Sequence, residues 1–210
     1  MKKQPDVTEA TKRRILNAFW ELFSRESPEK ITAAALSAAA GIHRSSFYRY
    51  FADIYQVLEV FQEGLLCHLK TEVETIQATT DISLPTYTEK VSVLLIGSAD
   101  KIYRLLNYKG SNFREQFIET LKPNVKKYIP LDRQNPNIEY ITAFIISSML
   151  FNFTFWYEHK EQYELSQVTA LGKSIILHGL PKSLPPFEMG ISDFEYGYAS
   201  SPCGAGLYLK

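Results

Sequence analysis

The stretch RSSFYRYF, residues 44–51, groups arginine, serine and tyrosine side chains that can all donate hydrogen bonds. An arginine can bind guanine or phosphate through two parallel N–H groups, and serine or tyrosine hydroxyls can bind base edges or phosphates. Catalytic motifs are not found: the sequence has no nucleophile elbow, phosphate-binding loop, dinucleotide fingerprint or zinc-protease motif. The stretch therefore favours nucleic-acid binding, and no enzyme activity is expected.

Two short helices joined by a glycine turn would position these side chains. In the alanine-rich segment ITAAALSAAAG, Thr32 provides an N-cap and Gly41 a left-handed stop for the first helix. A second helix over residues 44–51 places Phe47 and Phe51 on one face and leaves the polar side chains on the others. The arrangement is typical of a helix-turn-helix, whose second helix enters the DNA major groove. The alternative is an ordinary helical hairpin at the protein surface.

Charge is distributed unevenly along the 210 residues. The chain has 23 basic and 23 acidic residues in total, but residues 1–51 carry nine Lys or Arg and five acids, a balance of +4. The remainder has a balance of −4. This asymmetry indicates a module that faces a polyanion, attached to a neutral-to-acidic body. A solvated basic face is the simpler alternative.

Metal and cofactor chemistry are not expected. The two cysteines, Cys67 and Cys203, are far apart, and the four histidines show no metal-ligand spacing. No apolar run near the N-terminus is long enough for a signal peptide, so we expect a soluble cytoplasmic protein. The apolar segment 138–160 is interrupted by polar residues such as Asn152, and we expect a helix buried on several sides instead of a membrane span.

The hydrophobic periodicity predicts an all-α fold of two helical domains. A first amphipathic helix over residues 8–25 supports the helix-turn-helix within a domain of residues 1–52. Residues 53–180 form a larger domain, and residues 181–210 are a tail rich in Pro, Gly and Tyr. Helices of the larger domain are predicted at 53–79, 85–108, from about 113 to a kink or end at Pro123, at 138–160 and at 164–178.

Residues 11–61 resemble the N-terminal DNA-binding domain of TetR-type transcriptional regulators. The shared pattern comprises a first helix ending in ELF, then IT...L...AG, then GI.R.SFYRYF.D. The resemblance implies an all-helical fold, a homodimer, binding to a double-stranded DNA operator by the third helix, and a ligand pocket in a divergent C-terminal domain. From the motif and the resemblance we predict the DNA-binding residues Thr32, His43, Arg44, Ser45, Ser46, Tyr48, Arg49 and Tyr50.

Three departures from the family pattern suggest weak anchoring to the DNA backbone. Ile54 stands where many members have a lysine, Ala33 and Ala34 where members often carry polar or basic residues, and His43 where a Ser or Thr cap is usual. We therefore expect a shallow salt dependence of DNA binding. Compensation could come from the basic residues near the N-terminus, which are Lys2, Lys3, Lys12, Arg13 and Arg14.

In the larger domain, the resemblance implies a dimer interface built from the last two helices. Candidate contacts are Phe151, Phe155, Leu171, Ile175 and His178, with a role in the protein core as the favoured alternative for most of them. Aromatic candidates for the lining of a pocket are Tyr103, Phe117, Phe144 and Trp156, with plain core packing as the alternative. We therefore expect a ligand-responsive repressor that binds a palindromic operator as a homodimer, with a small hydrophobic or aromatic effector. The alternatives are a dimeric DNA-binding protein without an effector, and an enzyme or lipid carrier with a fortuitous hairpin.

Overall fold

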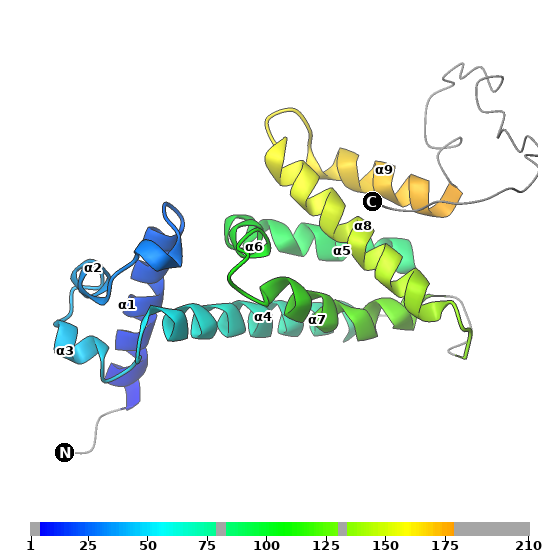
Figure 1. Ribbon diagram of the computed structural model, residues 1–210. Helices are drawn as coiled ribbons and strands as arrows, with labels where there is room; N and C mark the ends of the chain where they lie inside the picture. The colour runs from blue at the N-terminus through cyan, green and yellow to red at the C-terminus, as the bar shows by residue number, and fades with distance from the viewer. Residues whose placement is uncertain (1–4, 79–82, 130–133, 179–210) are drawn as a thin grey trace, which may run out of the picture.

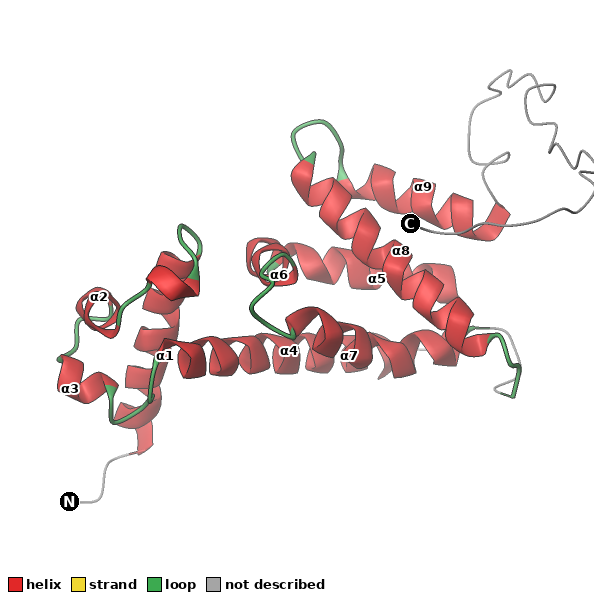
Figure 2. Ribbon diagram, viewed as in Figure 1, coloured by secondary structure: helices red, strands yellow, loops and turns green. Residues whose placement is uncertain are grey.

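The computed structural model describes residues 5–78, 83–129 and 134–178, and every regular element in these ranges is helical (Figures 1 and 2). The predicted tail 181–210 and the side chains of Lys2 and Lys3 lie outside the described residues. The helices are α1 (Pro5–Phe23), α2 (Ala33–Ala39), α3 (Arg44–Phe47), α4 (Ile54–Ala78), α5 (Leu84–Ile96), α6 (Ala99–Leu106), α7 (Phe113–Tyr128), α8 (Ile138–Glu158) and α9 (Leu165–His178), with a 3₁₀ turn, η1, at Pro28–Lys30.

A small unit of α1, α2 and α3 is attached to one end of the long helix α4 (Figure 1). The helix α4 extends from this unit into the larger body, where α7 packs along it. Helix α8 packs on α7 and on α9, and α9 also packs on α5. The prediction of an all-α protein with a helix-turn-helix and a larger helical domain is confirmed.

The small unit is held together by aromatic side chains of α1 and of the α3 region. Phe19 and Phe23 of α1 are fully buried and stack with their ring centroids 5.4 Å apart. Phe47 and Phe51 are also buried, as their spacing predicted. Such burial removes each phenyl ring from water and contributes roughly 2 to 3 kcal/mol. The orientation of α3 therefore follows from its apolar face.

Three helix boundaries differ from the prediction. The helix predicted over residues 85–108 is two helices, α5 and α6, which are separated at Gly97 and Ser98. Glycine disfavours a continued helix, and Ser98 has a non-helical φ of −128°. Pro123 lies inside α7, where the buried Phe117 and Val125 anchor the flanking turns. Helix α3 is shorter than predicted. After Phe47 the N–H groups of Arg49 and Tyr50 donate to carbonyl oxygens three residues earlier, which is the hydrogen-bond pattern of a 3₁₀ helix.

The prediction that the apolar helix α8 is buried on several sides is wrong. One face is buried, through Ile138, Thr142, Ile145, Ile146, Met149, Leu150 and Phe153. On the rest of the helix Tyr140, Phe144 and Phe151 are exposed. The length and apolar composition of α8 would suffice to cross a membrane, but core helices of soluble proteins share both properties, so they are weak evidence for a membrane protein. The exposed apolar residues are instead typical of a surface that meets another protein chain.

Candidate nucleic-acid interface

The turn between α2 and α3 depends on one glycine and one threonine. Gly41 has a φ of +62°, which side-chain-bearing residues rarely adopt. Thr32 caps α2, because its Oγ1 accepts a hydrogen bond from the Ala35 N–H at 3.1 Å. Ile42 follows the glycine and donates its N–H to the carbonyl oxygen of Ser37, which closes the turn. The positive φ of Gly41 and the Ile42–Ser37 hydrogen bond therefore fix the orientation of α3 relative to α2.

A side chain from α1 completes the turn. The Nη2 of Arg14 donates to the carbonyl oxygen of Ala40 at 2.7 Å and to that of Gly41 at 2.9 Å. These carbonyls belong to the end of α2, where a cation is also favoured by the helix dipole. The Nη2 group of Arg14 is therefore engaged in the turn, and the suggested compensation by Arg14 in DNA binding stays a prediction. Lys12 forms an exposed ion pair with Glu9 at 3.2 Å.

The outward face of α3 carries the predicted DNA-binding side chains. Arg44, Ser45, Tyr48 and Arg49 are exposed, whereas Ser46 and Tyr50 are half-buried. The Nη2 of Arg44 donates to the Tyr48 hydroxyl at 3.2 Å, and that of Arg49 donates to the Ser46 Oγ at 3.2 Å. Each arginine is thus held against a neighbour on the same face. Both remain accessible to a ligand outside the protein.

The electrostatics of this face favour an anion. No Asp or Glu occurs between Lys30 and Ala52, so Arg44 and Arg49 have no acidic neighbour in this stretch of sequence. His43 occupies the N-cap position of α3, is exposed, and makes no side-chain capping bond. Its imidazole is therefore available to an external partner. A basic, hydrogen-bonding helix at a protein surface is suited to phosphates and base edges.

The start of α4 lacks the cation that is usual in the family pattern. Ile54 is buried, and the first turn is closed by neutral and acidic groups. The Asp53 carboxylate accepts a hydrogen bond from the Gln56 N–H at 2.9 Å, and the Gln56 side chain accepts one from the Ala52 N–H at 2.6 Å. This reciprocal arrangement resembles a capping box and stabilises the helix start. It places a carboxylate, and no ammonium, beside the recognition unit.

The structure does not bring the four predicted ligand-binding residues into one pocket. Phe117 is buried in the core, Phe144 is 50% exposed, and Trp156 is half-buried against the ring of Phe153. The hydroxyl of Tyr103 donates to the Glu158 carboxylate at 2.8 Å. Residues 144 and 156 lie on the same helix about 18 Å apart along its axis, at 1.5 Å per residue. The assignment of these residues to a ligand site stays a prediction.

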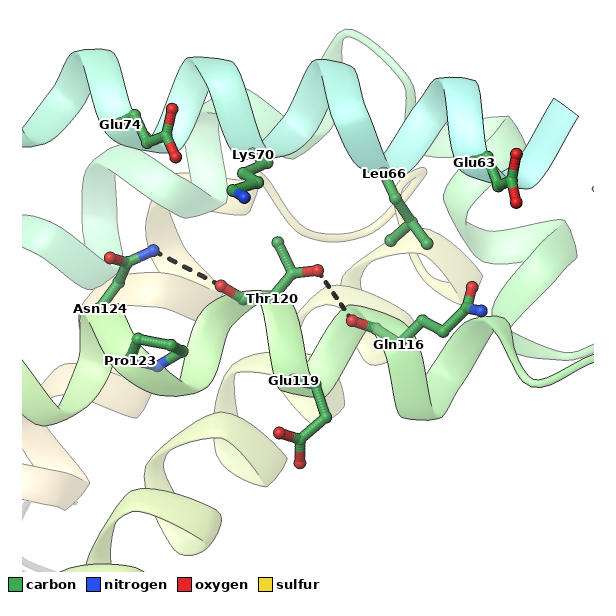
Figure 3. Close-up of a pocket in the computed structure, with 9 residues that line it drawn as sticks. All are labelled: Glu63, Leu66, Lys70, Glu74, Gln116, Glu119, Thr120, Pro123 and Asn124. Carbon is green, nitrogen blue, oxygen red and sulfur yellow. Dashed lines mark hydrogen bonds between the residues drawn. The ribbon is translucent and has the colours of Figure 1, made fainter. Parts of the chain in front are cut away.

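A surface hollow of about 590 Å³ lies between α4 and α7 (Figure 3). Leu66 and Lys70 of α4 point across it toward α7, and Gln116 lies opposite (Figure 3). Its full lining is Glu63, Leu66, Lys70, Glu74, Gln116, Glu119, Thr120, Pro123 and Asn124. The set holds three carboxylates and one ammonium group. Glu119 points away from α4 (Figure 3) and pairs with Lys122 at 3.4 Å, so the acidic character of the hollow comes from Glu63 and Glu74. Within the described ranges, no cluster of His, Cys, Asp and Glu could hold a metal ion.

Comparisons with known proteins agree with this geometry. Residues 15–60 match the family model of the bacterial regulatory proteins of the tetR family. No curated protein matches the sequence significantly.

Solved structures match along most of the chain. The fatty acid degradation regulator FadR from Bacillus halodurans has a TM-score of 0.64 at 14% identity, over 87% of this chain and all of that one. FadR from Bacillus subtilis, solved in complex with stearoyl-CoA, has a TM-score of 0.64 at 14% identity, over 80% of this chain and 98% of that one.

A TetR transcriptional regulator from Streptococcus agalactiae has a TM-score of 0.63 at 20% identity, over 81% of this chain and 96% of that one. At these identities the likeness concerns the fold alone, while the family model covers the helix-turn-helix itself. The helix-turn-helix geometry and the family match identify residues 15–60 as a DNA-binding domain of the tetR family of bacterial regulatory proteins, and the described chain shares its fold with solved TetR-type regulators.

Proposed function

We propose that this protein is a cytoplasmic, ligand-responsive repressor that binds a palindromic operator as a homodimer. The observation that carries the proposal is the exposed face of α3. There Arg44, Tyr48 and Arg49 project from a turn fixed by Gly41 and Arg14, in a segment without acidic residues. The recognition helix of a helix-turn-helix presents such donors to the major groove.

The proposed homodimer is supported by the exposed apolar surface of α8 and α9. Phe144, Phe151 and Leu171 are 50%, 65% and 46% exposed. Phe155 stacks on Phe151 with ring centroids 6.0 Å apart, and Ile175 is half-buried, whereas the side chain of His178 lies outside the described residues. A two-fold pairing through this surface would place two copies of α3 about one DNA turn apart, and the operator would then be an inverted repeat.

Selection of bound fragments from random DNA tests the DNA-binding function. We expect enrichment of an inverted repeat for the wild type. The Arg44→Ala variant should lose about tenfold or more in affinity, because a bidentate contact to a base contributes about 1 to 3 kcal/mol. Tyr48→Phe removes only a hydroxyl and should weaken binding uniformly across sequences. Arg25→Ala removes an exposed arginine outside α3 and serves as the matched control.

Three outcomes would count against the proposal. If no sequence is enriched at low salt, the protein is not an operator-binding regulator. If Arg44→Ala and Arg25→Ala bind equally well, α3 is not the recognition helix. If light scattering shows a monomer at the concentrations used for DNA binding, the palindromic operator is excluded as well.

The proposed effector is a small hydrophobic or aromatic molecule. The FadR protein of Bacillus subtilis, which shares the fold, was solved with stearoyl-CoA, so acyl-CoA thioesters belong in the first panel of compounds. A ligand can release DNA only if it binds the DNA-incompatible conformation more tightly than the operator-bound one. The expected result is a compound that raises the melting temperature of the free protein and lowers its affinity for operator DNA.

A dimeric regulator without an effector is the second candidate, and the packing of the body favours it. Tyr87, Phe113 and Phe117 are each at most 2% exposed and belong to the hydrophobic core of the body. The acidic hollow between α4 and α7 is also ill suited to the phosphates of a CoA group. If acyl-CoA thioesters, free fatty acids and planar aromatic compounds all leave the melting temperature and operator affinity unchanged, this second candidate is preferred.

A further inference from the structure

A side chain of α6 binds the end of α1, across the boundary between the body and the helix-turn-helix unit. The Nε of Arg104 donates to the carbonyl oxygen of Phe23 at 3.0 Å, and its Nη2 donates to that of Glu26 at 3.0 Å. The guanidinium also lies over the ring of Phe23, 5.2 Å from its centroid. These carbonyls are among those that a helix C-terminus leaves without partners, and a cation there is favoured by the helix dipole.

A second residue just beyond α6 reinforces this contact. The hydroxyl of Tyr108 donates to the carboxylate of Glu29 in η1 at 2.6 Å, and its ring meets that of Phe23 edge-on at 5.8 Å. Lys101, one turn earlier on α6, lies 6.0 Å from the ring centroids of Trp20 in α1 and Phe61 in α4. The contact with the DNA-binding unit therefore involves Lys101 and Arg104 of α6 and Tyr108 just beyond it.

On another side, α6 binds the end of α8. The hydroxyl of Tyr157 donates to the Asp100 carboxylate, and the hydroxyl of Tyr103 donates to Glu158 at 2.8 Å. The rings of Tyr103 and Tyr157 stack with their centroids 4.1 Å apart. The eight-residue helix α6 thus joins α8, whose exposed face would form the dimer, to α1, which supports the recognition helix.

We propose that α6 is a rigid connection that fixes the orientation of the DNA-binding unit on the dimer body, with Arg104 as the positioning residue. The inference rests on the proposed function as a dimeric operator-binding protein. In a dimer, the separation of the two recognition helices depends on how each DNA-binding unit is oriented on its own body. Helix α4 provides one covalent connection. The α6 contacts provide a second, non-covalent connection, and two points of attachment resist a rotation that one allows.

This role has a specific consequence for DNA recognition. The contacts between α3 and a single half-site do not involve Arg104, which lies on a different helix and binds α1 from the body side. Loss of the Arg104 contacts should therefore leave the affinity for a single half-site unchanged. It should also widen the range of half-site spacings that the dimer can bind. A residue that only stabilised the fold would lower affinity for all spacings equally.

The test compares operators whose two half-sites are moved apart or together by one or two base pairs. For the wild type we expect an affinity loss of about tenfold per base pair of altered spacing, because a rotated unit must strain both connections. For Arg104→Met, which keeps the length of the side chain and removes its donors, we expect a loss of less than about threefold. Affinity for the best spacing should fall, and affinity for a single half-site should not change.

Arg114→Met is the matched control. Arg114 of α7 also donates to a helix-terminal carbonyl, that of Leu106 at 3.1 Å, but this contact lies within the body. Its removal should keep the wild-type spacing profile. Tyr108→Phe removes the bond to Glu29 and keeps the ring. This variant should tolerate altered half-site spacing better than the wild type but less well than Arg104→Met. If Arg104→Met does not fold, the spacing profile of Tyr108→Phe tests the inference in its place.

The outcomes separate the inference from the proposed function. If the wild type binds no inverted repeat, the proposed function fails. If the wild type binds one and both Arg104→Met and Tyr108→Phe keep its spacing profile, the positioning role of α6 is refuted. Equal relaxation in Arg104→Met and Arg114→Met would also refute it, because general loosening of the body would then explain the effect.

Discussion

The guanidinium Nη2 of Arg14 lies 2.7 Å from the carbonyl oxygen of Ala40 and ties the first helix to the end of the second. The two residues are 26 positions apart in the sequence, and the bond also reaches Gly41. The charged side chain of Arg14 thus stabilises the packing of α1 against the turn between α2 and α3.

The Arg14→Met substitution should destabilise the protein and weaken operator binding. A hydrogen bond to a charged group contributes about 1.5 to 3 kcal/mol, and exposure to water places this pair at the low end. We expect the free energy of unfolding to fall by about 1.5 kcal/mol in urea titrations. Arg13→Met removes the neighbouring exposed arginine and should cost less than about 0.5 kcal/mol. Equal losses for the two variants would contradict a structural role for Arg14.

Two glycine substitutions should change stability in opposite directions. Gly41→Ala forces a side chain into the left-handed region at a φ of +62° and places its Cβ 2.8 Å from the Arg14 Nη2. We expect a loss of about 1 to 2 kcal/mol. Gly64→Ala, within α4, meets nothing within 4 Å and should stabilise the protein by roughly 0.5 to 1 kcal/mol. Denaturant midpoints measure both changes, and a neutral Gly41→Ala would contradict the strained turn.

The salt dependence of operator binding should be shallow. The Nη2 group of Arg14 binds the turn and Lys12 pairs with Glu9, so we expect Arg44 and Arg49 to make the main contacts of each protomer to DNA. At about −0.9 per neutralised phosphate, four contacts in a dimer give a slope of log K against log salt of about −4. Adding a cation at an exposed position of α2, in Ala34→Lys, should steepen the slope by about 2. A wild-type slope near −10 would refute the prediction.

The contact between Tyr108 and Glu29 should make stability sensitive to alkaline pH. Burial, followed by the hydrogen bond to Glu29, raises the pKa of Tyr108 to about 12. Because the pKa in the folded state lies above the ordinary value of 10, the neutral phenol stabilises the fold fully below pH 10. This contribution is lost as the pH rises from about 10 to 12.

Chemical denaturation at pH 8 and pH 11 measures this effect. The wild type should lose more stability between these values than Tyr108→Phe, which has no phenol to ionise. A second signature is the tyrosinate absorbance of the folded protein, in which Tyr108 should titrate later than an exposed tyrosine. Equal pH dependence in the two proteins would show that the phenol makes no such contribution.

The local architecture of the DNA-binding unit follows from short-range sequence rules. Thr32 caps its helix, Gly41 adopts a positive φ, and Phe47 and Phe51 are buried, each as its residue type and spacing predict. These features depend on interactions within about four residues, where backbone sterics and side-chain periodicity dominate. The helix-turn-helix motif and the all-helical class of the chain could therefore be predicted from the sequence.

The contacts between distant segments were decided by the tertiary structure alone. Nothing in the local sequence distinguishes Arg14, which binds a carbonyl of α2, from Arg13 beside it, and Arg104 binds carbonyls 78 and 81 residues away. Likewise, the apolar pattern of α8 did not reveal which face is buried. Periodicity records how polar a helix face is, whereas the partner of that face depends on how the helices assemble in three dimensions.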